Sequence, residues 1–214
     1  MYGRADGPHA LSATDAATLR SLHLATVIDL RTHDEVATRN RYAAVLSGVV
    51  EHRLPLANVL PEPEELAAWT NPLIVARYYR ALLDDAGATI AEILAILSDP
   101  SAYPAVFHGS AGKDRTGVVA AVLLGILGVP DDTIVADYAL SAGAMVRLIA
   151  HMHATYPDGS DQLHRLAAAI GAAEPAAMRA LLEGLRCDYG SFDGYAAAIG
   201  VDTAPRYVRE ALLV

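Results

Sequence analysis

The chain has 214 residues, of which 53% are hydrophobic and 19% are charged, and its formal net charge is -9. A chain this apolar buries enough surface to offset the entropy lost on folding, so disorder is excluded and a single domain over residues 1–214 is expected. The 25 acidic and 16 basic residues exclude the broad basic surface that is typical of nucleic-acid-binding proteins.

Cysteine usage and the apolar runs bear on where the protein works. Cys187 is the one cysteine, so no internal disulfide can form, and the cytoplasm is the expected compartment. The longest apolar run, residues 118–129, is shorter than the roughly 18 to 20 residues that cross a bilayer. The N-terminus lacks the apolar stretch of a secretory signal. We therefore expect no membrane span.

Short strand-like runs alternate with many helical patterns along the chain. Runs rich in β-branched and aromatic residues predict strands at 25–31, 49–54 and 102–108. Apolar residues at helical spacing, bounded by Pro, Gly, Asp or Ser, predict helices at 14–22, 62–69, 72–83, 88–97, 116–127, 131–140, 144–153, 162–170, 175–186, 191–199 and 205–212. This pattern is typical of an α/β domain with a small central sheet flanked by many helices and a helical insertion at about 61–98.

Residues 108–117 read His-Gly-Ser-Ala-Gly-Lys-Asp-Arg-Thr-Gly and lie between the third predicted strand and a helix that is apolar on every side. A tight turn that enters a helix directs several backbone N–H groups at one point, where the helix dipole adds positive potential. Arg115 can donate to two oxygens of an anion, and Lys113 adds a second cation. Small residues allow a close approach of the backbone at Gly109, Ser110, Ala111 and Gly112. An ordinary polar loop is the other interpretation, but this combination predicts a phosphate-binding loop.

The loop differs from the nucleotide-binding P-loop, because Phe107 replaces its first glycine and Asp114 follows Lys113. It resembles the signature of cysteine-dependent protein-tyrosine phosphatases in the form His-Cys-x-Ala-Gly-Lys-Asp-Arg-Thr-Gly, typical of the bacterial and fungal tyrosine, dual-specificity and phosphoinositide phosphatase branch. Further similarity to that branch lies in residues 26–31 with Glu35, 137–141 and 189–192. The resemblance implies a tyrosine-phosphatase-like fold and hydrolysis of phosphate monoesters without a cofactor or a metal ion.

Two departures from the family pattern matter. Gly109 stands where the family has its nucleophilic cysteine, whose thiolate attacks phosphorus. Glycine has no side chain for this step, and by analogy with other lost nucleophiles the rate falls by a factor of order 10⁶. The N-terminus is also short relative to the family, since the similarity begins at Tyr2, Arg4 and Asp6. This predicts the loss of an edge strand beside the pocket.

The resemblance also implies roles for the remaining residues. Arg115 would bind the phosphate and stabilise the transition state, and Asp114 is the candidate general acid, although a carboxylate at a helix start can simply favour the dipole. Asp29 is the second candidate acid, with a structural anchor as the other interpretation. Thr116 would keep a capping hydroxyl, and His108 would support the loop. The substrate-binding positions would be Ser110, Ala111, Gly112, Lys113, Arg115 and Thr116.

Several residues outside the loop have structural interpretations. The spacing of His151 and His153 places them on different faces of a helix, which speaks against a shared metal. Cys187 is interpreted as a buried structural thiol, because it lies far along the chain on a predicted helix, without the cluster of cations that the loop has. Arg77 and Arg80 in the helical insertion either contact an anionic substrate or are solvated.

Three functional hypotheses fit these residues. We favour a phosphomonoester hydrolase in which Gly109 replaces the nucleophile by engineering, since the rest of the loop is retained. The second is a natural pseudophosphatase that binds phosphate, and the third is an enzyme that acts on a phosphorylated metabolite without a cysteine. In each case the expected partner is a phosphorylated substrate: a phosphoprotein, a phosphoinositide or a small phosphate ester.

Overall fold

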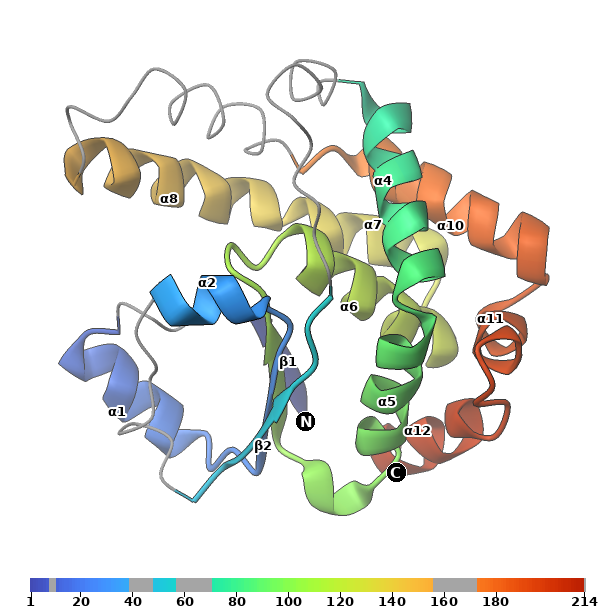
Figure 1. Cartoon of the computed structure of the whole chain (residues 1–214), viewed down its shortest axis with the longest axis horizontal. Coiled ribbons are helices and arrows are strands. Elements are labelled where there is room, and N and C mark those ends of the chain that lie inside the picture. The colour runs from blue at the N-terminus through green and yellow to red at the C-terminus, as the bar shows by residue number, and fades with distance from the viewer. Residues whose placement is uncertain (8–10, 39–47, 57–70, 156–172, 214) are drawn as a thin grey trace.

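The protein folds into a small sheet surrounded by helices, which confirms the predicted α/β class. The computed structural model (Figure 1) describes residues 1–7, 11–38, 48–56, 71–155 and 173–213. Figure 1 shows helices α1 (Ala13–Ser21) and α2 (His33–Thr38) on one side of the sheet and a larger group of helices on the other. The sheet therefore separates two helical layers of unequal size.

Parallel strands form the sheet in the described part of the chain, in the order β1-β4-β2-β3. They are β1 (Tyr2–Ala5), β2 (Thr26–Asp29), β3 (Val50–Arg53) and β4 (Ala105–His108). The last three coincide with predicted strands, whereas β1 does not, because its four residues contain no β-branched side chain. β1 occupies a sheet edge beside β4, and the loss of a further strand next to it stays a prediction.

The register brings the carboxyl ends of the strands together at one edge of the sheet. His108, the last residue of β4, is opposite Asp29 of β2 on one side and Ala5 of β1 on the other. The loop that follows β4 therefore leaves from between two neighbouring strands. Ligands of open α/β sheets bind at this edge, so the strand order alone places the loop where a site is expected.

The helices on the larger side follow the predicted pattern to within a few residues. They are α4 (Pro72–Asp85), α5 (Gly87–Leu97), α6 (Asp114–Ile126), α7 (Asp131–Ala139), α8 (Ser141–Thr155), α10 (Pro175–Tyr189), α11 (Phe192–Ala198) and α12 (Ala204–Leu212). The structure adds α2 and a short 3-10 turn at Pro100–Ala102, which the sequence patterns do not predict. The helices expected at 62–69 and 162–170 lie outside the described residues.

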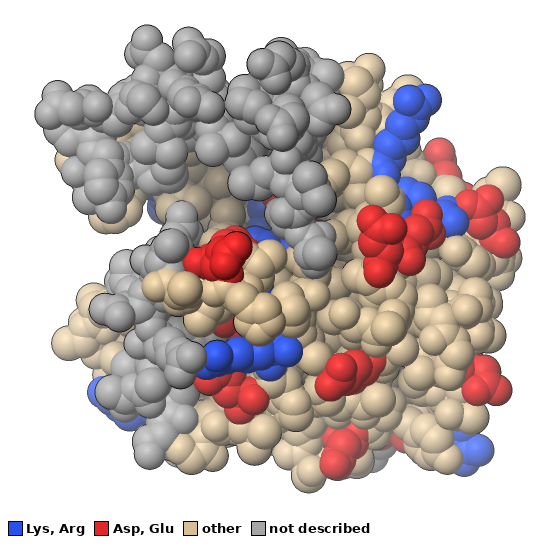
Figure 2. Space-filling model, in the orientation of Figure 1, with Lys and Arg blue, Asp and Glu red and all other residues tan. Residues whose placement is uncertain are grey.

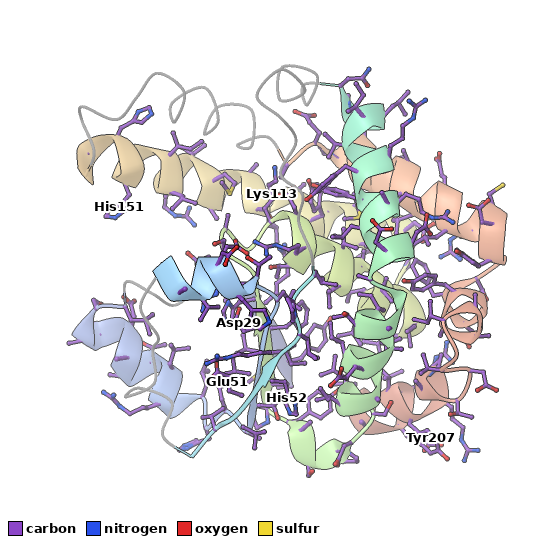
Figure 3. All side chains as sticks on the ribbon, viewed as in Figure 1. Asp29, Glu51, His52, Lys113, His151 and Tyr207 are labelled. Carbon is purple, nitrogen blue, oxygen red and sulfur yellow. The ribbon has the colours of Figure 1, made fainter. Side chains whose placement is uncertain are left out.

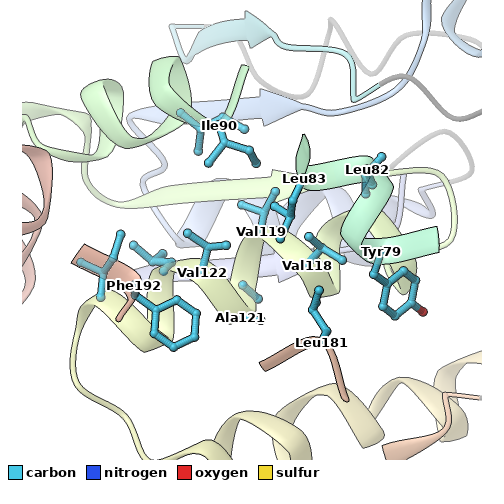
Figure 4. Close-up of a cluster of buried hydrophobic side chains, with 14 of the residues drawn as sticks. Tyr79, Leu82, Leu83, Ile90, Val118, Val119, Ala121, Val122, Leu181 and Phe192 are labelled. Atoms are coloured by element: carbon cyan, nitrogen blue, oxygen red, sulfur yellow. The ribbon is translucent and has the colours of Figure 1, made fainter. Parts of the chain in front are cut away.

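Helix α6 lies at the centre of the hydrophobic core, as its all-apolar sequence predicts. Every side chain from Val118 to Leu123 is buried, and each large one contributes about 1.5 to 3 kcal/mol by leaving water. Figure 4 shows how residues of α6 pack with side chains from four other helices, among them Tyr79, Leu83, Ile90, Leu181 and Phe192. Because the core holds α6 on all sides, the start of this helix has a fixed position relative to the sheet.

Within the described residues, one stretch meets the length and composition criteria for a membrane span. Asp131–His151 joins α7 to α8 over 21 residues and is apolar enough on average, although charged residues interrupt it. The expectation of no span was based on uninterrupted apolar runs and does not apply to such a stretch. Its α7 half contributes Ile134, Val135 and Tyr138 to the buried core. That packing favours a helix pair of the folded domain.

The surroundings of two helical glycines predict that substitution by alanine has opposite effects on stability at the two positions. A Cβ at Gly125 of α6 would lie 2.3 Å from the ring of Phe192, whereas a Cβ at Gly184 of α10 would meet nothing within 4 Å. We expect Gly125→Ala to lower the free energy of unfolding by about 1 to 3 kcal/mol through overpacking. Gly184→Ala should raise it by about 0.5 to 1 kcal/mol, because alanine favours the helix. Urea unfolding of both variants measures the two changes in the free energy of unfolding. If both substitutions changed it in the same direction, the packing described here would be contradicted.

Candidate active site

The loop after β4 is packed against the chain that follows β1. The Gly7 N–H donates to the Ser110 carbonyl oxygen at 3.0 Å. Gly112 has a φ of +68°, and a Cβ there would lie 2.7 Å from the Asp6 backbone nitrogen and 2.8 Å from the Ala5 carbonyl oxygen. Both the backbone angle and the close approach require glycine at this position. The unpredicted strand β1 is thus one wall that shapes the loop.

Arg4 of β1 joins the loop to the helices behind it. Its guanidinium donates to the Gly112 carbonyl oxygen at 3.3 Å and to the Ser141 hydroxyl at 3.0 Å, and its Nε lies 3.1 Å from a carboxylate oxygen of Asp137. Sequence reasoning did not assign Arg4 this role. The available signal was the family resemblance, which includes both Arg4 and residues 137–141.

Gly109 is buried at the bottom of the loop and faces two polar side chains. Its N–H donates to the Thr116 hydroxyl oxygen at 2.9 Å. A Cβ at Gly109 would lie 3.2 Å from the same oxygen and 3.6 Å from Arg115 Nε. The shorter distance asks for a shift of a few tenths of an ångström in a rotatable hydroxyl. A side chain at position 109 would therefore point between Arg115 and Thr116.

Arg115 is buried, with 6% of its surface exposed, and one edge of its guanidinium is fully engaged. Its NH1 donates to the Leu30 carbonyl oxygen at 3.2 Å and to Glu35 Oε2 at 2.7 Å, and its NH2 donates to Glu35 Oε1 at 2.7 Å. A guanidinium has five N–H donors, so the Nε–H and the second NH2 hydrogen are left over from these contacts with described residues. These two point along one edge, and its Nε is 3.6 Å from the Cβ position of residue 109. The arrangement presents a two-pronged donor for the oxygens of an anion.

Glu35 holds Arg115 because the start of α2 fixes its carboxylate. The Thr32 N–H donates to Glu35 Oε2 at 2.8 Å, and the Glu35 N–H donates to the Thr32 hydroxyl at 3.3 Å, which is a capping box. Burial raises the pKa of Glu35, but hydrogen bonds from Arg115 and the Thr32 amide outweigh it and lower the pKa to about 2. The spacing Thr-x-x-Glu is readable in the sequence and is the signal that could have identified both α2 and this residue.

Asp114 is the first residue of α6, and one of its carboxylate oxygens accepts a hydrogen bond from a tyrosine of the core. Its Oδ1 accepts from the Tyr79 hydroxyl at 2.5 Å and lies 3.3 Å from Lys113 Nζ. Lys113 is 1% exposed, and Figure 3 shows it at the start of α6. Among the described residues, no side chain caps the N-terminus of this helix. The first-turn N–H groups, Lys113 and Arg115 gather at this point, and the carboxylates of Asp114 and Glu35 accompany the two cations. Figure 2 shows acidic and basic side chains mixed on the face in view.

Asp29 is a structural anchor in this structure, which argues against its use as a general acid. Its carboxylate is fully buried and accepts from Arg31 Nε at 2.9 Å and from Arg31 NH2 at 2.7 Å. Burial raises the pKa of Asp29, but the Arg31 hydrogen bonds outweigh it and lower the pKa. His108 Nδ1 lies 3.8 Å away and contacts the Gly109 carbonyl oxygen at 3.0 Å. Burial lowers the pKa of His108, so a neutral imidazole supports the loop.

The remaining candidate residues do not gather at the loop. Figure 3 shows His151 on α8, well away from Lys113, and no metal-binding group of residues occurs in the described part of the chain. Cys187 is exposed on α10 rather than buried, which corrects the expectation of a structural thiol in the core. Arg80 is paired with Asp84 at 2.9 Å and with residues of α10, so its guanidinium is turned away from the loop. Arg77 is exposed.

The strand order and the place of the loop define an α/β domain with a candidate anion site at the carboxyl ends of its strands. The family model of the tyrosine phosphatase family matches residues 1–214, and the chain belongs to this family. It is similar to a tyrosine-protein phosphatase of Nostoc commune, with 28% identity over 89% of this chain and 66% of that protein. The chain thus spans about two thirds of the length of that relative.

Two further relatives support the same assignment. A protein of Cupriavidus necator that is named as a tyrosine-protein phosphatase is 30% identical over 99% of this chain and 74% of its own length. The triple specificity protein phosphatase PtpB of Mycobacterium tuberculosis is 32% identical over 64% of this chain and 59% of its own length. These matches confirm the resemblance that the loop residues indicate.

The lowered pKa of Glu35 makes its contribution to stability depend on pH. A carboxyl whose pKa is lower in the folded state stabilises the fold above its unfolded pKa, near 4.5, and this stabilisation is lost as the pH falls toward about 2. We therefore expect the parent to exceed Glu35→Gln in free energy of unfolding above about pH 5, and the gap to narrow below it.

Urea unfolding of both proteins at a series of pH values measures this gap. Glu210→Gln is the matched control, because it removes an ion pair to Arg206 that is exposed and contributes little. A gap between the parent and Glu35→Gln that stays constant on acidification would contradict the role of the Arg115 pair.

Proposed function

We propose that the form of this protein with cysteine at position 109 is a phosphomonoester hydrolase, and that the chain with Gly109 binds the phosphate dianion without hydrolysing its ester. The observation that carries the proposal is the place of residue 109, whose Cβ would lie 3.2 Å from the Thr116 hydroxyl oxygen and 3.6 Å from Arg115 Nε. A thiolate on that Cβ would lie beside a hydroxyl donor and a guanidinium, which stabilise negative charge on sulfur. Position 109 is thus built for a nucleophile that the chain lacks.

The cysteine form would work in two steps. In the first, the thiolate attacks phosphorus, the P–O ester bond breaks, and the leaving oxygen takes a proton from the Asp114 carboxyl. The free edge of Arg115 binds the equatorial oxygens throughout, because the negative charge of the transferred phosphoryl group is spread over them in the transition state. In the second step water attacks the phosphocysteine, its proton passes to Asp114, and inorganic phosphate and the thiolate are released. Glycine has no atom for the first bond.

The names of the relatives guide the choice of substrate. Two of them are named as tyrosine-protein phosphatases, and PtpB is named for triple specificity. We infer that aryl phosphates, with phosphotyrosine as the natural example, are the first substrate class, and that the protein works in the cytoplasm. Phosphoinositides and small phosphate esters present the same dianion to Arg115.

A natural pseudophosphatase is the second candidate, and one observation favours it. The Gly109 N–H donates to the Thr116 hydroxyl oxygen, and this bond needs no side chain at position 109. The loop therefore keeps this hydrogen bond when the thiol is missing. The codon at position 109 of the gene separates the candidates. A cysteine codon supports an inactivating replacement, whereas a glycine codon supports a natural binding module.

The chain with Gly109 should bind a tetrahedral dianion. We expect inorganic phosphate or tungstate to raise the melting temperature, because a ligand at about 100 times its Kd stabilises the fold by about 2.7 kcal/mol. Arg115→Lys should weaken this binding roughly 10-fold or more, since lysine keeps the charge and loses the two-pronged geometry. Arg77→Lys is the matched control on the exposed face of α4 and should bind as the parent does. Equal binding of the anion to the parent, Arg115→Lys and Arg77→Lys would contradict the proposed phosphate-binding loop.

Restoring the nucleophile should create turnover. We expect Gly109→Cys to hydrolyse aryl phosphates in a metal-independent, vanadate-sensitive reaction, with a gain that can reach an order of 10⁶ over the parent. Gly109→Ser is the control, because it fills the same place with a much weaker nucleophile. Steady-state kinetics on para-nitrophenyl phosphate with a chelator present measures the gain. If the chain with Gly109 turned over aryl phosphates as fast as Gly109→Cys does, the cysteine mechanism would be overturned. A Gly109→Cys variant that is no more active than the chain with Gly109 would overturn it as well.

A further inference from the structure

Two buried tyrosines form a chain of hydrogen bonds that ends on the carboxylate of Asp114. The Tyr79 hydroxyl of α4 lies 2.5 Å from Asp114 Oδ1, and the Tyr138 hydroxyl of α7 lies 2.6 Å from the Tyr79 hydroxyl. Both rings are almost fully buried, and they meet edge to face at 6.0 Å. Neither tyrosine belongs to the loop, and both come from helices far from it in the sequence.

The direction of these hydrogen bonds follows from the groups involved. A carboxylate oxygen only accepts, so Tyr79 donates its O–H to Asp114, and Tyr138 must then donate to Tyr79. Burial, and next the charge of Asp114, raise the pKa of both tyrosines well above the usual value. Both phenols therefore keep their protons at physiological pH and remain donors. The O–H groups in this series of hydrogen bonds therefore all point the same way, from α7 through α4 to the start of α6.

The two oxygens of Asp114 consequently differ. Oδ1 faces the donors Tyr79 and Lys113, whereas neither of these contacts involves Oδ2. As long as Tyr79 donates to Oδ1, that oxygen is an acceptor, and the proton of the carboxyl belongs on Oδ2. About 14% of the Asp114 side chain is exposed, which leaves it accessible at the loop.

The position of Tyr138 depends on a glycine of the loop motif. A Cβ at Gly117, in the first turn of α6, would lie 2.9 Å from the Tyr138 ring. Glycine at this position lets the ring approach α6 closely enough for its hydroxyl to reach Tyr79. The final glycine of Lys-Asp-Arg-Thr-Gly thus makes room for the tyrosine that supports the aspartate three residues before it.

We propose that Tyr79, supported by Tyr138, is a positioning residue that fixes Asp114 so that Oδ2 delivers the proton to the leaving oxygen. This inference rests on the proposed function and adds the residues that orient its acid. The step remains balanced: the sulfur–phosphorus bond forms, the P–O ester bond breaks, and the proton moves from Oδ2 to the departing oxygen. Tyr79 and Tyr138 keep their own protons throughout.

The experiment uses Gly109→Cys as the active background and compares Tyr79→Phe with Tyr195→Phe. Tyr195 is the matched control, because it is equally buried and its hydroxyl donates to the Leu83 carbonyl oxygen, away from the loop. Phenyl phosphate and para-nitrophenyl phosphate differ in how much their leaving oxygens need a proton. In Tyr79→Phe we expect kcat/KM for phenyl phosphate to fall roughly 10- to 100-fold, as part of the 10² to 10⁴ that general acid catalysis supplies.

Four further readouts separate positioning from a structural defect. For Tyr79→Phe, kcat/KM on para-nitrophenyl phosphate should fall less than about 3-fold, since its leaving group needs little protonation. The inhibition constant of inorganic phosphate should be unchanged, because the loop and Arg115 are intact. Adding Tyr79→Phe to Asp114→Asn should cause no further loss on phenyl phosphate, and Tyr138→Phe should show a smaller loss than Tyr79→Phe.

The outcomes are distinguishable. Equal losses on both substrates, a weaker phosphate inhibition, additive losses with Asp114→Asn, or the same loss in Tyr195→Phe would each overturn the positioning role and leave the proposed function standing. An inactive Gly109→Cys protein would overturn the proposed function and this inference with it. A leaving-group-dependent loss confined to Tyr79→Phe and Tyr138→Phe would support it.

Discussion

Two hydrogen bonds of 2.7 Å join Arg115 to Glu35 and hold the guanidinium in one plane, with its other edge toward residue 109. The pair also connects the two helical layers, since Glu35 belongs to α2 on one side of the sheet and Arg115 to α6 in the central core. Removing one partner of such a pair leaves a partly buried charge unpaired, which is strongly destabilising. The pair thus fixes the orientation of the Arg115 edge that would bind an anion in the proposed function.

Most of the fold could be predicted because it depends on local patterns. Helix α6 is apolar on all sides and is buried on all sides, and β2, β3 and β4 coincide with β-branched or aromatic runs. Strand β1 could not be predicted from its composition, because it becomes a strand only by pairing with β4. Helix α2 has six residues, too few for a periodic pattern, and only its capping box marks it.

The candidate site was predictable where its residues are neighbours in the sequence. The loop from Gly109 to Thr116 could be interpreted as an anion site by itself, whereas Glu35 and Tyr79 act on it from positions 80 and 35 residues away. Such contacts depend on how α2 and α4 pack, which no local spacing encodes. Asp29 shows the converse, because a carboxylate at a strand end fits two roles, and the contact with Arg31 decides for the anchor.

In the proposed function, the difference between cysteine and glycine at position 109 changes the electrostatics of the site more than its shape. A thiolate at position 109 and a bound dianion would place like charges close together beside Arg115, so part of the attraction of the cradle would offset that repulsion. With Gly109 the loop keeps its hydrogen bond to Thr116 and the ion pair to Glu35, and the repulsion is absent. Under the proposed mechanism, glycine at position 109 would therefore remove the chemical step and favour retention of the phosphate ester. Catalysis and binding would separate at this residue, because backbone amides and Arg115 would bind the anion and the sulfur would only react with it.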